Sequence, residues 1–241
     1  MLTYNVNKVN MENECRSISS RIKSLTSSFK DVFFRTVGEV LRMNVTKFNK
    51  ILFRCAYWFK APWDVGGPQP VVKELEQEGQ IKGRVLDLGC GTGDTAIFLA
   101  QKGYEVMGID YLPRAIDLAL ARAKRAGMQI PFRLFDAMKL DQLQERFDTV
   151  IDLGLFHNLS DKDRIRYKFS LESAMEPGGI FHMLCFSDSQ PGFIGPRRIS
   201  REEIYQAFSN GWRVDSIRET KYKVYYPIGG AKSWIASIRK V

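Results

Sequence analysis

One short string, RVLDLGCGTGDTA at residues 84–96, limits the fold of this chain more than any other feature. It places a run of apolar residues before Gly89, Gly91 and Gly93, and a helix start at Asp94. Glycines at such a turn let the main chain approach a ligand closely, where a side chain would collide. The string therefore predicts a buried strand, a ligand-binding turn and a helix.

Strand and helix signals alternate along the rest of the chain. We expect strands over 84–88, 105–109, 132–135, 147–152, 180–186, 212–219 and 233–239, and helices over 94–102, 113–126, 161–175 and 200–208. Alternation implies parallel strands with crossover helices, and the last two strands, separated only by a loop, should pair antiparallel. The sequence thus predicts an α/β fold with a Rossmann-like, seven-stranded, mostly parallel sheet and helices on both faces.

The first 60 residues differ from the rest of the chain. Residues 1–28 are polar without a clear period, whereas residues 29–60 combine helical spacing of apolar residues with seven Lys and Arg residues. Such basic amphipathic helices could cap the catalytic domain, contact an anionic membrane or a partner, or belong to a cleaved transit peptide. A breaker-rich linker follows at 61–70, so we expect an extension over 1–60 and a catalytic domain over 61–241.

The positive charge is concentrated in that extension. The chain has a net charge of +9, but residues 1–60 hold 11 Lys and Arg against four Asp and Glu, and residues 61–241 hold 25 against 23. A near-neutral catalytic domain lacks the basic surface that a nucleic-acid substrate requires. Without an apolar run of about 18 residues, we expect a soluble, cytoplasmic domain, with membrane association through the extension left open.

Cysteine and histidine usage makes a metal site unexpected. The four cysteines, Cys15, Cys55, Cys90 and Cys185, are scattered and form no CxxC pair, which argues against a zinc site and against a disulfide framework. Only His157 and His182 could add imidazole ligands. We therefore expect no metal and a reducing compartment.

Three acids fall where three expected strands end. Asp87 lies beside the glycine turn, Asp110 follows it by 23 residues, and Asp136 closes FRLFDA. The carboxyl ends of parallel strands form the ligand-binding edge of such sheets, where Asp110 could bind ribose hydroxyls and Asp136 an adenine amine. Asp87 could meet an ammonium group. Each acid alone could equally be a loop or helix cap.

Asp94 bears on which nucleotide the turn would hold. The spacing of the turn is GxGxG, and Asp94 takes the place of the third glycine in the dinucleotide pattern GxGxxG. An acid at a helix N-terminus would repel a pyrophosphate, whereas a cationic sulfonium ligand would tolerate it. The loop therefore suits S-adenosylmethionine better than NAD.

The string VLDLGCGTGDTAIFLAQKGYEVMGID, continued by FDTVIDLGLFHNLSD and MEPGGIFHMLCFSD, resembles the class I S-adenosylmethionine-dependent methyltransferases over about residues 61–241. PWDVGGPQP, DLGLFHNL and GPRRIS resemble the thiopurine and thiol methyltransferase-like group, which implies methyl transfer to a small molecule through sulfur or another soft atom. The expected cofactor is S-adenosylmethionine, and the expected cofactor-binding residues are Trp63, Asp87, Gly89, Gly91, Gly93, Asp110, Tyr111, Asp136, Ala137 and Asp152.

Methyl transfer is a displacement at an activated carbon, so the protein must align the reactants and, where needed, deprotonate the acceptor. His157 follows the fourth strand and could take a proton or hold the acceptor, or be a structural loop residue. Trp63 could close over the cofactor and Asp64 could receive a hydrogen bond from the acceptor, although a packed hinge tryptophan is the alternative.

Other candidate acceptor contacts follow the fifth strand and precede the last one. One guanidinium of Arg197 and Arg198 could clamp an anionic acceptor, or the pair could neutralise Glu202 or Glu203. Tyr225 and Tyr226 could line the acceptor pocket, or form a hairpin rim.

Four functions compete at this point. A small-molecule methyltransferase with a thiol or another soft acceptor leads, with O- or N-methylation of a natural product as the alternative. Methylation of RNA or protein is disfavoured by the near-neutral charge of residues 61–241. The others are a non-catalytic cofactor-binding partner protein and a NAD-dependent dehydrogenase, the latter disfavoured by Asp94.

Overall fold

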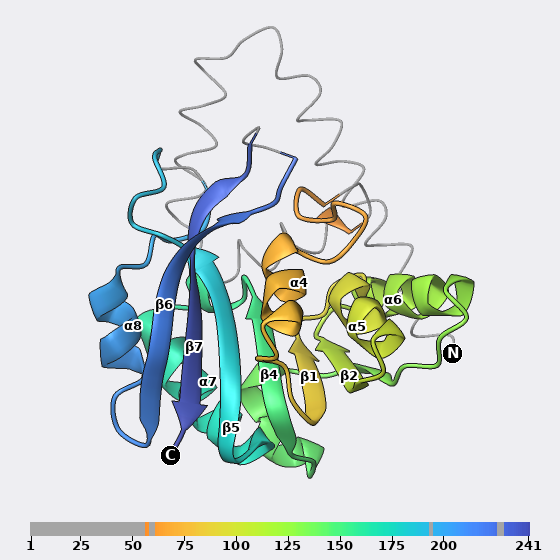
Figure 1. Ribbon diagram of the computed structural model, residues 1–241, viewed down its shortest axis with the longest axis horizontal. Helices are drawn as coiled ribbons and strands as arrows, with labels where there is room; N and C mark the ends of the chain where they lie inside the picture. Colours follow the sequence, from red (N-terminus) through yellow and green to blue (C-terminus); the bar gives the residue numbers. More distant parts are fainter. Residues whose placement is uncertain (1–55, 58–60, 193–194, 226–228) are drawn as a thin grey trace, which may run out of the picture. The chain divides into compact units, whose positions relative to one another are not determined.

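The computed structural model describes residues 56–57, 61–192, 195–225 and 229–241 of the chain (Figure 1). Residues 61–241 form one unit by their contacts, over the range that the sequence assigns to the catalytic domain. The basic segment at 29–60 lies outside the described residues, apart from residues 56 and 57, so its interpretations stay open. None of the described helices is both long and apolar enough to cross a membrane.

Strands and helices alternate along this unit. The strands are β1 (Arg84–Leu88), β2 (Glu105–Asp110), β3 (Phe132–Leu134), β4 (Phe147–Leu153), β5 (Met175–Phe186), β6 (Trp212–Tyr222) and β7 (Ala231–Lys240). The helices are α4 (Pro70–Gln77), α5 (Asp94–Gln101), α6 (Pro113–Arg125), α7 (Asp161–Ala174) and α8 (Arg201–Ala207), with 3-10 helices η2 (Ala137–Leu143) and η3 (Phe156–Asn158).

The strands form one sheet in the order β3-β2-β1-β4-β5-β7-β6. All neighbours are parallel except that β7 runs antiparallel to both β5 and β6. This arrangement confirms the predicted mostly parallel sheet that ends in a hairpin. From β1 the chain first builds β2 and β3 on one side and then crosses to β4 on the other, so the carboxyl ends of β1 and β4 flank the point at which ligands bind in such sheets.

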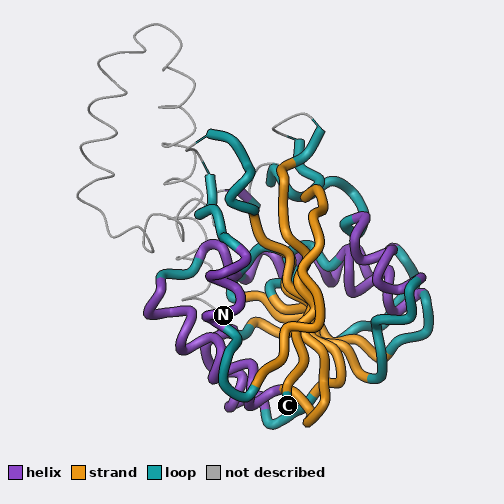
Figure 2. Tube along the Cα trace, turned by 60° about the vertical axis from the view of Figure 1, so that its left-hand side comes forward, coloured by secondary structure: helices purple, strands orange, loops and turns teal. Residues whose placement is uncertain are grey.

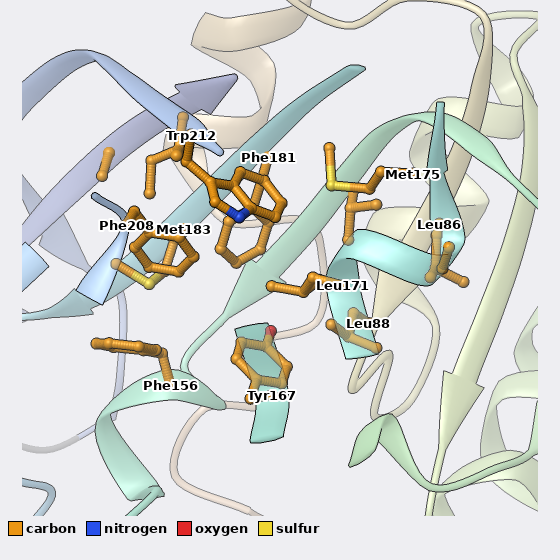
Figure 3. Close-up of a cluster of buried hydrophobic side chains, with 14 of the residues drawn as sticks. Leu86, Leu88, Phe156, Tyr167, Leu171, Met175, Phe181, Met183, Phe208 and Trp212 are labelled. Atoms are coloured by element: carbon orange, nitrogen blue, oxygen red, sulfur yellow. The ribbon is translucent and has the colours of Figure 1, made fainter. Parts of the chain in front are cut away.

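Helices cover both faces of the sheet (Figures 1 and 2). Helices α4, α5 and α6 bury their apolar residues with one face of the strands, and η2, α7 and α8 bury theirs with the other. Figure 3 shows part of the second layer, in which the rings of Phe156, Tyr167, Phe181, Phe208 and Trp212 pack against one another. Each face is therefore a closed core, which fixes the strand ends in place.

The structure departs from the sequence prediction in two places. Helix α4 begins at Pro70, inside the stretch interpreted as a linker, and it buries Val71, Val72 and Leu75. Proline is well suited to the first helical position because its missing N–H would have no partner there. Strand β5 begins at Met175, with a register shift against β4 between Phe147 and Thr149, so it is longer than the predicted strand at 180–186.

Candidate functional site

The glycine turn lies directly after β1 and has one tightly packed and one open glycine. Gly93 has a φ of 81°, and a Cβ atom there would lie 2.8 Å from Phe132 Cζ. At Gly89, with a φ of 73°, a Cβ atom would meet only Leu155 Cβ, at 3.9 Å. Gly93 is therefore required for packing, whereas Gly89 leaves the main chain open to a ligand on the side of the loop after β4.

The acids at the ends of β1 and β2 shape the turn. The Asp110 carboxylate accepts hydrogen bonds from the main-chain N–H of Gly91 at 3.0 Å and of Leu112 at 2.9 Å. Asp87 accepts a hydrogen bond from the main-chain N–H of Ala96 at 3.2 Å. Both side chains are buried. The sequence correctly places them at one edge, and each carboxylate keeps lone pairs beyond those that these main-chain hydrogen bonds occupy.

Burial raises the pKa values of the two acids at this edge. The pKa of Asp87 is raised to about 7, first by burial and then by the neighbouring carboxylates of Asp110, Asp94 and Asp152, against the opposing effect of the Ala96 N–H. Burial likewise raises the pKa of Asp110 to about 6, although its main-chain hydrogen bonds oppose the change. A cationic ligand would stabilise these carboxylates in their ionised form.

Asp152, at the end of β4, binds the protein itself. Its carboxylate accepts hydrogen bonds from the main-chain N–H of Gly154, Leu155 and Phe156 at 2.9, 2.6 and 3.0 Å, and from the Tyr167 hydroxyl at 2.8 Å. The side chain is fully buried. Four donors fill the lone pairs of the carboxylate. Asp152 thus holds the loop after β4 in shape, and the cofactor contact expected at this residue stays a prediction.

The residues expected near adenine lie after β2 and β3. Asp136 is exposed and caps η2 by accepting the main-chain N–H of Met138 at 3.0 Å. Ala137 is half-buried at the start of η2, and Tyr111 is 38% exposed after Asp110. Asp136 therefore acts as a helix cap through Oδ1. Within the described residues, Oδ2 has no hydrogen bond and could accept one from an adenine amine, so that role stays a prediction.

Trp63 and Asp64 belong to the segment that precedes α4. Trp63 is half-buried against the apolar layer that contains α4 and α5. Asp64 forms an ion pair with Arg122 at 2.6 Å, and the same guanidinium binds Asp94 at 2.6 Å. The other oxygen of Asp64, Oδ1, is buried and has no hydrogen-bond partner in the described part of the chain. It remains an acceptor for a ligand donor.

The Arg122 bridge changes one argument made from sequence. Asp94 was treated as an unpaired acid that would repel a pyrophosphate, but Arg122 on α6 neutralises it. The electrostatic preference against NAD at this helix start is therefore weaker than the sequence indicates. The carboxylates of Asp87 and Asp110, which have no cationic partner among the described residues, now carry that preference.

His157 lies in η3, in the loop that Asp152 organises. It is 3% exposed, and its Nδ1 accepts the main-chain N–H of Phe186 at 3.0 Å. The pKa of His157 is lowered to about 3, mainly by burial and in addition by the charges of Arg164 and Arg198. The imidazole is therefore neutral at physiological pH. His182, by contrast, is a core residue of β5 with both ring nitrogens within hydrogen-bond distance of Ser237 and Gln80.

The structure gives Arg197 the second of its two predicted roles. The side chain is exposed and forms ion pairs with Asp161, at 2.5 Å, and with Glu203. These contacts place Arg197 on the surface next to α8, so the acceptor clamp expected at this residue is not supported. Arg198 instead lies over the Phe186 ring, with 5.6 Å between Cζ and the ring centroid.

Tyr225 connects two segments that are distant in sequence. Its main-chain N–H donates to the Pro62 carbonyl at 2.9 Å, and its side chain is 48% exposed. The amide of Gln69 binds both main-chain groups of Lys223, at 3.0 and 2.8 Å. The segment before α4 and the end of β6 thus form one rim beside the strand ends. Tyr226 lies outside the described residues.

Sequence reasoning missed several residues of this site. Arg122 lies 28 residues from Asp94 and 58 from Asp64 along the chain. Tyr222 donates its hydroxyl to the Leu153 carbonyl at 3.1 Å, and its ring lies 6.0 Å from that of Phe186. No local pattern marks these partners. Tyr222 lies beyond the end of the strand expected at 212–219, so the strand prediction did not draw attention to it.

Residues 85–179 match a family model described as a methyltransferase domain. The 2-heptyl-1-hydroxyquinolin-4(1H)-one methyltransferase of Mycobacteroides abscessus is 35% identical to this chain over 161 residues, which cover 66% of this chain and 71% of that protein. The similarity therefore spans more than two thirds of that relative.

Two solved structures extend the comparison. One belongs to work on the conversion of a disulfide bond into a thioacetal group during echinomycin biosynthesis. It is 33% identical to this chain, with a TM-score of 0.71, and the match covers 78% of this chain and 91% of that one. The other, magnesium protoporphyrin IX methyltransferase from Synechocystis with bound S-adenosylmethionine, is 20% identical, with a TM-score of 0.62 and coverage of 83% and 98%. The second comparison supports the fold.

Proposed function

This chain belongs to the S-adenosylmethionine-dependent methyltransferases, and on that basis we propose that it methylates a heteroatom of a small, ring-containing acceptor. The cofactor supplies a methyl group activated on a sulfonium centre. The residues of this chain bind and orient the two reactants and exclude water between them. We assign the cofactor side to the ends of β1, β2 and β3, and the acceptor side to the loop after β4.

The cofactor side fits a cationic sulfur nucleoside. Gly89 leaves an open place at the turn, and Asp87 and Asp110 are buried acids without a cationic partner among the described residues. A sulfonium and an ammonium group would compensate these acids, and the ribose hydroxyls would donate to Asp110. Trp63, Tyr111, Asp136 and Ala137 complete the proposed cofactor contacts from the surrounding segments.

The observation that carries the acceptor proposal is a group of rings at the loop after β4. The imidazole of His157 lies edge-on to Phe186, with 4.9 Å between the centroids, and Phe186 lies edge-on to Tyr222. Leu155, in the same loop, faces Gly89. An aromatic and aliphatic wall of this kind suits a planar, apolar molecule better than a polymer.

An oxygen attached to a ring is the first candidate for the acceptor atom. The relative with 35% identity is named for a 1-hydroxyquinolinone, and this chain covers 71% of that protein. Sulfur, which the motifs shared with the thiopurine and thiol group favour, is the second candidate. The structure from echinomycin biosynthesis, a process that forms a thioacetal, supports it. We propose no nucleic-acid substrate, because residues 61–241 are nearly neutral.

A labelled-methyl screen tests this proposal. The purified chain is incubated with labelled S-adenosylmethionine and a panel of N-hydroxyquinolinones, phenols, thiols, aliphatic alcohols, amines, RNA and protein. We expect transfer to the ring hydroxyls or thiols, and none by a Gly89→Val variant, whose side chain fills the open place at the turn. Transfer only to RNA or protein would overturn the proposal.

A further inference from the structure

The tautomer of His157 is fixed by the main chain of β5. The Phe186 N–H donates to Nδ1 at 3.0 Å. A main-chain amide can only donate, so Nδ1 must carry a lone pair, and the proton of the neutral ring lies on Nε2. The lone pair of Nδ1 is already used by the protein. The ring therefore offers a donor and no free basic nitrogen.

That donor lies at the loop after β4. A Cβ atom on Gly154 would lie 3.3 Å from Nε2 of His157 and 3.5 Å from the Tyr222 hydroxyl oxygen. The Tyr222 hydroxyl is occupied by the Leu153 carbonyl. Within the described residues, no group accepts a hydrogen bond from Nε2 of His157, and Nε2 is not among the fully buried atoms that lack a partner. The Nε2–H is therefore available to donate to a ligand or to water.

Two guanidinium groups surround this donor with positive charge. Arg164 lies over the ring of Phe156, the residue before His157, with 4.6 Å between Cζ and the ring centroid. Arg198 lies over the ring of Phe186, which itself contacts the His157 ring. Arg164 is 8% exposed, and its Nε and Nη2 have no hydrogen-bond partner in the described part of the chain. Its partners Glu203 and Asp161 lie at 3.3 and 3.6 Å from Nη1.

Asp152, in the same loop, does not accept the Nε2–H of His157. The Asp152 carboxylate is filled by three main-chain N–H groups and the Tyr167 hydroxyl. Burial, together with Arg164 and Arg198, keeps His157 neutral by lowering its pKa to about 3. Burial by itself disfavours a charge of either sign, so it is the positive charge of Arg164 and Arg198 that favours an anion at this place.

We propose that the acceptor side binds its substrate as an already ionised aromatic hydroxyl or thiol, with the Nε2–H of His157 as the hydrogen-bond donor and no protein base. The inference rests on the proposed function. The acid loses its proton to water before it binds. Its lone pair then forms the bond to the methyl carbon while the bond from that carbon to the sulfonium sulfur breaks, and the electron pair stays on sulfur. The preferred substrates are acids whose pKa lies near or below neutral.

Nitrogen NMR of the full chain tests the state of His157 without any turnover. With ¹⁵N-labelled histidine, only two imidazoles contribute, and His157→Asn identifies one of them. We expect His157 to stay neutral, with its proton on Nε2, from pH 5 to pH 8. Protonation of the ring near neutrality, or a proton on Nδ1, would overturn the inference.

Kinetics with substituted phenols and thiophenols of graded acidity test the role of the donor. We expect the rise of kcat/KM with pH to follow the pKa of each acceptor. The Asn of His157→Asn can still accept the Phe186 N–H but is too short to reach the Nε2 position, so kcat/KM should fall about 10- to 100-fold, the range for one hydrogen bond to a charged group, without a change in that pH dependence.

Arg166→Gln, on the exposed face of α7, is the matched control and should leave kcat/KM unchanged. A rise at one fixed pH for every acceptor, lost in His157→Asn, would identify a base and overturn this inference alone. A chain that binds S-adenosylmethionine but methylates no member of either series would overturn the proposed function, while the NMR result would still decide the tautomer.

Discussion

At the scale of single residues, the same amino acid at the same kind of position does two different things. Asp87 and Asp152 both end a parallel strand and both are buried. Among the described residues, Asp87 accepts a hydrogen bond from one donor, whereas Asp152 accepts from four. The difference arises from Tyr167 and from the path of the chain after β4, which no local sequence pattern encodes. Sequence therefore identifies the acids but not which of them a ligand can reach.

Removing the charge of Asp152 should destabilise the protein. Asp152→Asn replaces one acceptor oxygen by an NH₂ group, so buried N–H donors lose their partner, and we expect a loss of about 3 kcal/mol. Tyr167→Phe removes a single donor and should cost about 1 kcal/mol. Urea unfolding of the two variants measures both values. Equal losses would contradict the view that Asp152 organises the loop.

Two glycine substitutions should separate folding from cofactor binding. Gly89→Ala adds a methyl group in open space at a positive φ, so we expect a stability loss of about 1 kcal/mol and cofactor affinity lower by about tenfold or more. Gly93→Ala places its methyl group against Phe132 and Ala119 and should cost about 2 to 4 kcal/mol. Thermal unfolding and calorimetric titration with S-adenosylhomocysteine measure the two effects. Unchanged affinity in Gly89→Ala would argue against the open place at the turn.

At the scale of elements, the sequence predicts what periodicity and strand ends encode. All seven expected strands and the four expected helices are present, because apolar runs bounded by turn residues mark the strands, although α7 has almost no amphipathic period. Helix α4 was missed because the residues just before it, 61–69, contain prolines and glycines typical of a linker, although Pro70 begins a helix that buries Val71 and Val72. The Arg122 bridge between α6, α5 and the segment before α4 could not be predicted, since its partners meet only in the folded chain.

The ends of β1 and β2 should make stability and cofactor binding depend on pH. The pKa values of Asp87 and Asp110 rise on folding to about 7 and about 6. The folded chain therefore binds these protons more tightly than the unfolded chain, so their contribution to stability is present at low pH and is lost as pH rises from about 4 to about 7. A cationic ligand favours the ionised acids and should raise the melting temperature more at pH 8 than at pH 5.

Thermal unfolding with and without S-adenosylmethionine across this range provides the measurement. Calorimetry at pH 6.5 in two buffers of different ionisation enthalpy should also detect protons released on binding. Asp87→Asn is the control, because it removes the group with the larger change in pKa. A ligand-induced increase in melting temperature that is the same at every pH would contradict the assignment of these acids to the cofactor side.

The Arg122 bridge should join α6 to the segment before α4. Arg122→Gln leaves Asp64 and Asp94 without their cation in a partly buried place, so we expect a stability loss of about 2 kcal/mol and weaker cofactor binding. Arg125→Gln, at an exposed position of the same helix, should change neither quantity. Chemical unfolding and calorimetric titration of the two variants give the comparison. Equal behaviour of both would show that the bridge is dispensable.

At the scale of the whole molecule, residues 61–241 contain every element described and both apolar layers. We propose that this part folds and binds the cofactor without residues 1–60. A chain that begins at residue 61 should unfold cooperatively and bind S-adenosylhomocysteine as the full chain does. Loss of either property would make the extension part of the catalytic fold. Binding of the full chain alone to anionic vesicles would support the membrane interpretation of the extension.

The pairing of the Gln69 amide with the main chain of Lys223 joins positions 154 residues apart. Each of these stretches forms part of the same border, so neither can be remodelled without disturbing the other. During divergence toward new acceptors, an insertion in one stretch would require a compensating change in its partner. We therefore expect the two stretches to vary in concert among descendants of this protein, while β1 and its glycine turn remain constant.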